Sequence, residues 1–389
     1  MSVRRVAACA LLAGLLAVPA SMAGVLTPPG APGPTMKTLD EVEPRIPLGP
    51  LTTPGDADSV YRITQPGSYY LTGEVLGQAG SYGVQIEASD VTLDLMGFTV
   101  RGVSGARSGL IVSGGAQTGV TIINGVFRDW PEYGASVGAE TSIVRNAQFI
   151  ANGFDGLSIR SGVVESCTAR ENAFSGFRAQ QATTFRNCAA EDNLGDGINS
   201  GINSSVINCV ALLNGDDGIY GGSASTIIGC SAQQNDGDGF EVAFGSTITG
   251  CGARANGERG IRAADSLVER CVTDVNALDG VLVASDSVVR DCLSSGNGTD
   301  PAGGAGIRVT GSDNRLEGNT VLDNDIGIDI DSAGNLVARN TAAGNPTPYD
   351  IIVNNKVGPV VVAPNSGAIL GAAGGAGLGS TYPCANFSY

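Results

Sequence analysis

Charged and polar side chains recur at two fixed positions around a repeated Gly-apolar pair, and these residue types can do acid–base, metal or sugar chemistry. Directly before each glycine stand Asp155, Ser175, Asp196, Asp217, Asp238, Arg259 and Asp279. Two residues after the same glycines stand Ser158, Arg178, Asn199, Tyr220, Glu241, Arg262 and Leu282. From these two sets we predict a catalytic group made of Asp196, Asp217, Asp238 and Arg262. The predicted substrate-binding residues beside it are Arg178, Asn199, Tyr220, Glu241 and Arg259.

Carboxylates brought close together repel one another, and three outcomes relieve the repulsion. One carboxyl can keep a proton, which suits the general acid of a glycosidase. A carboxyl pair one repeat apart would then match retention, and a pair two repeats apart would match inversion. Asp196, Asp217 and Asp238 can instead bind Ca²⁺, which prefers several oxygen ligands. The third outcome is a solvated acidic face without catalysis, and the sequence alone leaves all three open.

The composition removes several other kinds of chemistry. Histidine is absent from the 389 residues, so Ser-His-Asp, Cys-His and His-zinc mechanisms are excluded. Asp and Glu number 38 against 22 Lys and Arg, which gives a formal charge of −16 and argues against a protein that binds a phosphate backbone. We therefore predict no nucleic-acid partner.

A repeat of about 21 residues must position these side chains. Cysteines fall at 167, 188, 209, 230, 251, 271 and 292, with spacings of 21, 21, 21, 21, 20 and 21, and an asparagine follows each by five residues. The repeat is rich in Val, Ile and Thr, shows no helical periodicity, and divides into three short runs separated by turn residues. These features predict an all-β chain folded as a β-solenoid. Twelve Gly-apolar pairs, from Gly83-Val84 to Gly327-Ile328, predict about twelve coils.

Three columns of the aligned repeat are expected to face the core. The first is the cysteine column, which we interpret as small buried apolar side chains rather than as disulfides or a metal site. Apolar residues stand three positions before each cysteine, and small residues stand two positions after it. The asparagines are expected to form a ladder in which each side-chain amide donates to a carbonyl of the next coil.

The chain is predicted to contain further segments outside the repeat. Arg4 and Arg5 precede an apolar run and the small residues Ser21-Met22-Ala23, which is typical of a secretory signal peptide. We therefore expect a secreted, periplasmic or cell-surface protein without a membrane span. The predicted segments are a signal peptide 1–23, a proline-rich linker 24–56, an N-terminal cap 57–82, a parallel β-helix 83–355 and a Gly/Ala-rich tail 356–389.

The repeated Asn-x-x-x-Gly-[Ile/Phe] pattern, the segment Val91–Val100 (VTLDLMGFTV) and the cap-like Gln65–Leu71 (QPGSYYL) resemble the right-handed parallel β-helix proteins of the pectate-lyase-like superfamily. The resemblance spans about residues 57–355. It implies a right-handed parallel β-helix whose outer strand face can carry a catalytic groove. The superfamily holds polysaccharide lyases, glycoside hydrolases, uronate epimerases, pectin esterases, phage depolymerases and catalytically silent surface proteins, so the fold does not select one activity.

The resemblance also implies a lyase route. In the Ca²⁺-dependent lyases of this superfamily, the cation and an arginine neutralise a uronate while a base takes the C5 proton. Because histidine is absent, Arg262 or Arg259 would have to be that base here. Asn214–Ile219 (NGDDGI) is similar to the polygalacturonase Gly-Asp-Asp-Cys-Ile pattern, but glycine replaces its cysteine and the repeat itself supplies most of the match.

The loop Arg128–Tyr133 holds the only tryptophan of the chain, Trp130, close to Tyr133. Because sugar faces stack on exposed aromatic rings, we predict that Trp130 and Tyr133 also bind substrate. Packing of these rings against the solenoid is the alternative.

Two functions are compatible with these residues. The first is a secreted β-helix protein that binds a polysaccharide or cell-surface glycan on the Asp/Arg face. If this protein is an enzyme, it cleaves that ligand as a lyase or a hydrolase. The second is a non-catalytic surface or structural β-helix protein. The substrate, the oligomeric state and the choice between lyase and hydrolase are left open.

Overall fold

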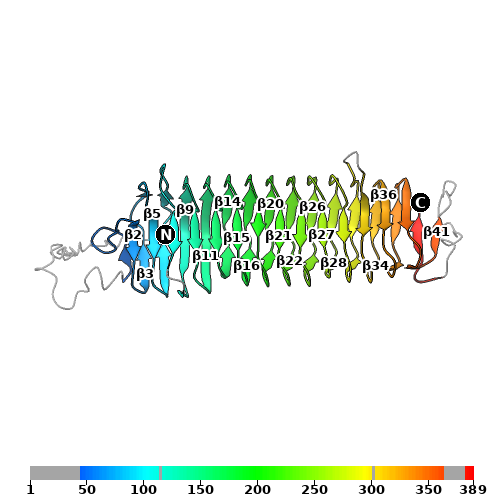
Figure 1. The fold of residues 1–389 in the computed structure, drawn as a ribbon, viewed down its shortest axis with the longest axis horizontal. Helices are drawn as coiled ribbons and strands as arrows, with labels where there is room; N and C mark the ends of the chain where they lie inside the picture. Colours follow the sequence, from blue (N-terminus) through cyan, green and yellow to red (C-terminus); the bar gives the residue numbers. More distant parts are fainter. Residues whose placement is uncertain (1–43, 114–115, 300–302, 363–381) are drawn as a thin grey trace, which may run out of the picture. The chain divides into compact units, whose positions relative to one another are not determined.

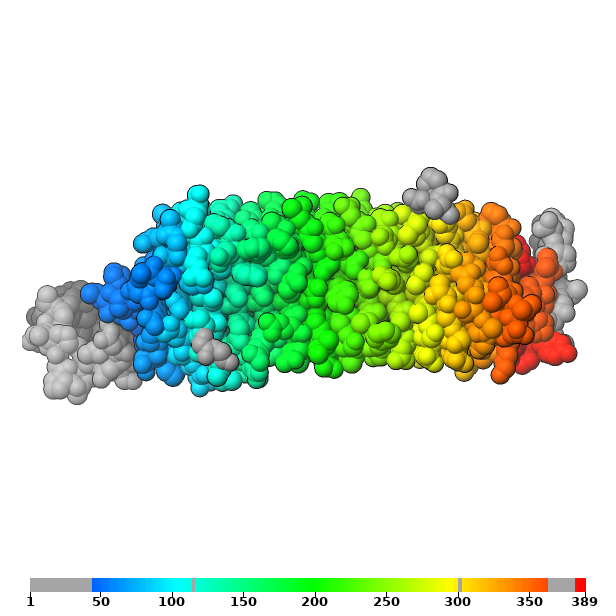
Figure 2. Space-filling view, viewed as in Figure 1, coloured from blue at the N-terminus to red at the C-terminus, as the bar shows by residue number. Residues whose placement is uncertain are grey.

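The computed structural model describes residues 44–113, 116–299, 303–362 and 382–389 (Figure 1). The predicted signal peptide, the linker up to residue 43 and the Gly/Ala-rich stretch 363–381 lie outside the described residues. Residues Arg45–Tyr389 form one compact unit. Successive turns of this unit follow one another in chain order and pack directly on their neighbours (Figure 2).

The regular elements of the described residues are all β-strands, which pair in parallel within two sheets. The predicted all-β parallel solenoid is therefore confirmed. One sheet takes a single strand from each turn, and the other takes two. The first sheet contains β2 (Ser59–Ile63), β5 (Tyr82–Ile86), β8 (Leu110–Val112), β10 (Ala135–Val137), β12 (Leu157–Ile159), β15 (Phe177–Ala179), β18 (Ile198–Asn199), β21 (Ile219–Gly221), β24 (Phe240–Val242), β27 (Ile261–Ala263), β30 (Val281–Val283), β33 (Ala305–Val309), β36 (Ile326–Ile330) and β39 (Thr347–Ile351).

The second sheet has 28 strands, arranged as two parallel series joined through the long strands β9 (Thr121–Arg128) and β11 (Ser142–Ile150). One series contains β1 (Ile46–Pro47), β3 (Gly67–Tyr70), β6 (Val91–Asp94), β13 (Gly162–Glu165), β16 (Thr183–Arg186), β19 (Ser205–Ile207), β22 (Thr226–Ile228), β25 (Thr247–Thr249), β28 (Leu267–Glu269), β31 (Val288–Arg290), β34 (Arg315–Glu317), β37 (Leu336–Ala338) and β40 (Lys356–Val357). The other contains β4 (Val75–Leu76), β7 (Thr99–Arg101), β14 (Thr168–Arg170), β17 (Ala189–Glu191), β20 (Val210–Leu212), β23 (Ser231–Gln233), β26 (Gly252–Arg254), β29 (Val272–Asp274), β32 (Leu293–Ser295), β35 (Thr320–Leu322), β38 (Thr341–Ala343), β41 (Val360–Val362) and β42 (Asn386–Ser388).

The coil count was predicted slightly too low. The single-strand sheet has fourteen strands, whereas the Gly-apolar pairs predicted about twelve coils. The two additional strands are β2 and β39, and neither contains the Gly-apolar pair on which the prediction was based. Their places at the two ends of the sheet explain why their sequences depart from the repeat.

The core consists of the columns expected from the sequence. The seven repeat cysteines are unpaired and at most 3% exposed, and the apolar residues three positions before them are 0% exposed. The asparagine ladder is also confirmed. Asn214 Nδ2 donates to Asn235 Oδ1 at 2.9 Å and to the Ala190 carbonyl at 3.2 Å. The ladder therefore ties each turn to both of its neighbours and satisfies polar groups that burial would otherwise penalise.

Both ends of the described unit differ from the predicted linker and tail. In the predicted linker, β1 pairs with β3, and Leu48 is only 4% exposed. In the predicted tail, β42 pairs with β38 and β41. Strands β1, β41 and β42 lie outside the 21-residue repeat, so no column of repeated residues indicated them. Among the described residues, no helix is long and apolar enough to serve as a membrane span.

Candidate functional site

Four neighbouring strands of the fourteen-stranded sheet, β18, β21, β24 and β27, carry the candidate site on their outer face. Strand pairing places Asn199, Tyr220, Glu241 and Arg262 in one row, each opposite the next. The residue before each of them on its strand is 0% exposed, as in Ile219 and Phe240. Because side chains alternate across a strand, burial of one set turns the other set outward.

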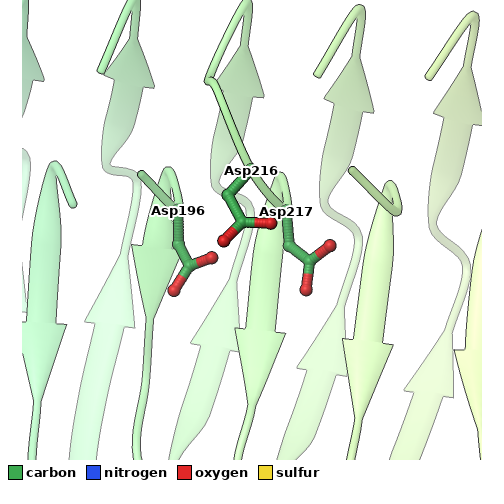
Figure 3. A group of neighbouring side chains, drawn as sticks. All are labelled: Asp196, Asp216 and Asp217. Carbon is green, nitrogen blue, oxygen red and sulfur yellow. The ribbon is translucent and has the colours of Figure 1, made fainter. Parts of the chain in front are cut away.

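A shallow pocket of about 370 Å³ lies over these strands. It brings together seven residues that the sequence singled out, namely Asp196, Asn199, Asp217, Tyr220, Asp238, Glu241 and Arg262. It also contains three that the prediction omitted, Asp216, Gly237 and Glu258. Figure 3 shows the carboxyl group of Asp216 between those of Asp196 and Asp217.

The aspartates of the pocket are fixed by hydrogen bonds from backbone and side chain. The amide of Asp238 donates to Asp217 Oδ1 at 2.8 Å, and the amide of Arg259 donates to Asp238 Oδ1, also at 2.8 Å. Asn199 Nδ2 donates to Asp196 Oδ2 at 2.9 Å. The aspartate column is thus part of the fold as well as of the pocket.

Burial raises the pKa of Asp196, Asp217 and Asp238, and the increase is large for the last two. Removal of the Asp217 carboxyl from water, together with the negative charge of Asp238, raises the pKa of Asp217 to about 8. Burial also raises the pKa of Asp238 to about 6, although the amide and guanidinium of Arg259 oppose that rise. A pKa of about 8 favours the protonated form of Asp217 at neutral pH, which corresponds to the first of the three outcomes considered for neighbouring carboxylates.

The three candidate arginines lie in different places. Arg262 lines the pocket, and its Nη1 lies 3.2 Å from Glu241 Oε1. Arg259 lies beside the pocket, with Nη1 2.9 Å from Glu258 Oε2 and 3.6 Å from Asp238 Oδ1. Arg178 Nε lies 2.9 Å from Asp155 Oδ2, one strand away from the pocket residues. Two of the predicted binding residues, Arg178 and Arg259, therefore flank the pocket and do not line it.

The pocket oxygens could also coordinate a cation. Ligand atoms of Asp217, Asp238 and Glu241 lie within 4.8 Å of one another, as do those of Asp196, Asp216 and Asp217. This spacing and the all-oxygen donor set fit Ca²⁺, whose oxygen ligands lie at about 2.3–2.6 Å. Asp217 belongs to both groups, so an ion there would displace the proton that Asp217 otherwise holds.

The prediction for Trp130 was wrong. Its side chain is only 1% exposed and its Nε1 donates to the carbonyl of Val100 at 2.9 Å. Trp130 occupies the position that asparagine holds in later turns, since its amide donates to Asn152 Oδ1. The indole therefore fills the core where the ladder ends, and no sugar can stack on it.

Tyr133, the other predicted aromatic, lies on the surface outside the pocket. Its ring stacks on that of Phe154 with centroids 5.4 Å apart, and Phe154 lies 5.3 Å from Phe174. Sequence reasoning overlooked Phe154 and Phe174, although both stand two residues after a ladder asparagine. Asp216 and Glu258 occupy the same position of later turns, so this column was the signal for all four.

Comparisons with known proteins agree with this geometry. A family model described as "Right handed beta helix region" matches residues 108–266 and 219–366. A search of curated proteins gives no match. The A-module of mannuronan C-5 epimerase AlgE4 from Azotobacter vinelandii is similar in structure, with a TM-score of 0.52 and 14% identity over 76% of this chain and 90% of the other. A mutant of the periplasmic alginate epimerase AlgG gives a TM-score of 0.51 and 13% identity over 70% of this chain and 83% of the other.

At these identities the likeness to the two epimerases establishes a common fold. Together with the matching family model, it confirms the predicted right-handed parallel β-helix.

Proposed function

The chain belongs to the right-handed β-helix family, and on that premise we propose that it is a secreted or cell-surface protein that binds a polysaccharide and hydrolyses it. The observation that carries the proposal is the convergence of Asp217, Glu241 and Arg262 with hydroxyl and amide side chains in one outward pocket. The names of its structural relatives support the choice of ligand, since mannuronan and alginate are polysaccharides.

The pocket offers both kinds of group that a bound sugar requires. Asn199 and Tyr220 stand next to each other in the strand row and can hydrogen-bond sugar hydroxyls. Asp217 and Glu241 supply the two carboxyls of a glycosidase, and their oxygens lie within 4.8 Å of each other. Carboxyls about 5–5.5 Å apart serve retaining glycosidases, whereas inverting enzymes need a wider gap for water.

The proposed reaction has two steps. Asp217 gives its proton to the glycosidic oxygen while a Glu241 oxygen bonds to the anomeric carbon and the glycosidic bond breaks. A water molecule then attacks that carbon and loses a proton to Asp217, and the ester to Glu241 breaks. One water is consumed for each bond cleaved. Arg262 acts as a positioning residue, because its ion pair with Glu241 orients that carboxyl.

The lyase route fits the pocket less well. It requires Arg262 or Arg259 to accept a proton from the substrate. The guanidinium of Arg262 already faces Glu241, and that of Arg259 faces Glu258 and Asp238. These ion pairs stabilise the protonated guanidinium groups, which opposes their use as a base. A hydrolase instead needs a proton donor, and Asp217 supplies one.

A non-catalytic glycan-binding protein is the second candidate, and one specific observation favours it. Asp217 and Asp238 each accept a backbone amide from the next turn, and Asp279, outside the pocket, does the same with the amide of Ala305 at 2.9 Å. A carboxyl at this position therefore has a structural use that requires no chemistry.

The test uses the mature protein with a panel of neutral, amino-sugar and uronate polysaccharides. We expect new reducing ends from at least one of them, and we expect Asp217→Asn to abolish their release. Asp279→Asn is the matched control. Asp279 also stands directly before the glycine of its turn but lies outside the pocket, so this variant should keep activity. Binding without new reducing ends or unsaturated products would favour the non-catalytic candidate. Absence of binding to every polysaccharide would overturn the proposal.

A further inference from the structure

We infer that Tyr133, Phe154 and Phe174 form a stacking platform that extends the glycan-binding pocket, and that the polysaccharide bound there is a non-acidic one. This inference rests on the proposed function and names both the path and the class of its substrate. The evidence comes from three features, namely the exposure of two of the rings, their alignment with the pocket, and the charge of the pocket.

The three rings form a short run on the surface. The centroids are 5.4 Å apart for Tyr133 and Phe154, and 5.3 Å apart for Phe154 and Phe174. Phe154 is 39% exposed and Phe174 is 48% exposed, whereas the inward Phe149 and Phe177 of the same turns are 0% exposed. Neighbouring large apolar side chains that remain in contact with water often mark a binding surface.

The platform is aligned with the pocket. The amide of Gly195 donates to the carbonyl of Phe174, and the amide of Gly237 donates to that of Asp216, so these residues occupy one position of successive turns. Phe174 and Asp216 are therefore two turns apart, which is roughly 10 Å at about 4.8 Å a turn. One extended chain can reach from the rings to the pocket carboxyls.

The turn between the rings and the pocket carries no side chain at the position that Phe174 and Asp216 occupy in their turns. Gly195 stands between Phe174 and Asp216, and a Cβ atom there would lie 3.1 Å from the carbonyl carbon of Phe174. Beside it, the side chain of Leu194 is 72% exposed. An exposed apolar side chain, that of Leu194, thus lies on the turn between the platform and the pocket.

The charge of the pocket selects the class of ligand. Even with the Asp217 carboxyl neutral, the pocket lining contains the carboxyls of Asp196, Asp216, Asp238, Glu241 and Glu258 against one guanidinium, that of Arg262. A chain of uronates would bring further negative charge to this surface and be repelled. Neutral sugars avoid that cost, and amino sugars gain attraction, while both present apolar C–H faces that can cover aromatic rings.

The experiment measures binding of three hexasaccharides by isothermal titration calorimetry at neutral pH: cellohexaose, chitosan hexaose and hexagalacturonate. We expect binding of at least one of the first two and much weaker binding of hexagalacturonate. The double variant Phe154→Ala/Phe174→Ala should raise Kd about tenfold, as expected for two lost stacking contacts. Phe174→Leu keeps apolar bulk and should also weaken binding, with an unchanged melting temperature as evidence of folding.

Phe244→Ala is the matched control, because Phe244 is 64% exposed but is not part of the platform or the pocket. Binding that both platform variants leave unchanged would overturn the platform while the proposed function stands. Tightest binding of hexagalacturonate would overturn the substrate class. Failure of every hexasaccharide and polymer to bind would instead overturn the proposed function.

Discussion

The backbone amide of Asp238 donates a 2.8 Å hydrogen bond to Oδ1 of Asp217, one turn earlier in the β-helix. This bond gives Asp217 two roles, because one oxygen helps to join successive turns while the carboxyl also lines the pocket. It also brings the two carboxyls close enough for the charge of Asp238 to raise the pKa of Asp217. Burial of the carboxyl is the larger cause of the raised pKa, and the stacked charge of Asp238 adds to it.

Stability should depend on the proton of Asp217 in a defined direction. Its pKa rises from 3.8 in the unfolded chain to about 8 in the fold, so between these values the folded state holds a proton that the unfolded state lacks. The contribution of Asp217 to stability is therefore complete below about pH 4 and is lost as the pH rises through about 8. We expect the wild type to lose more stability than Asp217→Asn between pH 5 and pH 9. Parallel pH profiles of urea midpoints would contradict the prediction.

The rate of hydrolysis should also depend on the proton of Asp217. Because Asp217 donates it in the first step, kcat should fall as the pH rises above about 8. The profile is measured with the polysaccharide that releases reducing ends. Rates that stay constant to pH 10 would exclude Asp217 as the general acid.

Calcium is expected to bind the pocket carboxyls in competition with that proton. Ca²⁺ at millimolar concentration should raise the melting temperature of the wild type, and the increase should be larger at pH 8 than at pH 6. Glu241→Gln and Asp217→Asn should each reduce it, while Asp279→Asn should leave it unchanged. If Ca²⁺ leaves the melting temperature unchanged at both pH values, the predicted calcium site is wrong.

The asparagine ladder should carry much of the stability between turns. Asn214→Ala leaves the buried Ala190 carbonyl without its donor and the Asn193 amide groups without their acceptor. We expect a loss of about 3 kcal/mol in the free energy of unfolding, from several unsatisfied buried groups. Asn199→Ala, on the half-buried outer row, should cost less than about 1 kcal/mol. Equal urea midpoints for the two variants would count against the ladder as a major source of stability.

Trp130 should affect stability and leave glycan binding unchanged. Trp130→Phe removes the Nε1 donor to the Val100 carbonyl and leaves space in the core, which should cost about 2 kcal/mol. The Kd for the bound hexasaccharide should stay at the wild-type value in the folded variant. A higher Kd together with unchanged stability would support the original prediction that Trp130 binds substrate.

Most of the fold was predictable from the spacing of Cys167 and its six successors. In a parallel stack with a nearly constant period, residues 21 apart in sequence become neighbours in space, so each column of the alignment becomes a column of the structure. The row from Asn199 to Arg262 was found in this way. The end strands of the fourteen-stranded sheet, β2 and β39, were missed because they lack the Gly-apolar pair.

The turns were harder to predict than the strands. Alternation of side chains in a strand sets which residue points outward, but no such rule applies to Asp216, Glu258, Phe154 or Phe174, which precede the strands. Their directions depend on the local turn conformation. Trp130 was misplaced for a related reason, since only its contacts identify it as the residue that ends the asparagine ladder.

The sequence by itself determined which residues are stacked, because a fixed period translates directly into position along a parallel β-helix. The tertiary structure decided how deeply each residue is buried and what it faces. Burial sets the pKa of Asp217, the exposure of Phe174 and the inaccessibility of Trp130. These properties depend on desolvation and on neighbouring turns, and periodicity does not encode either of them.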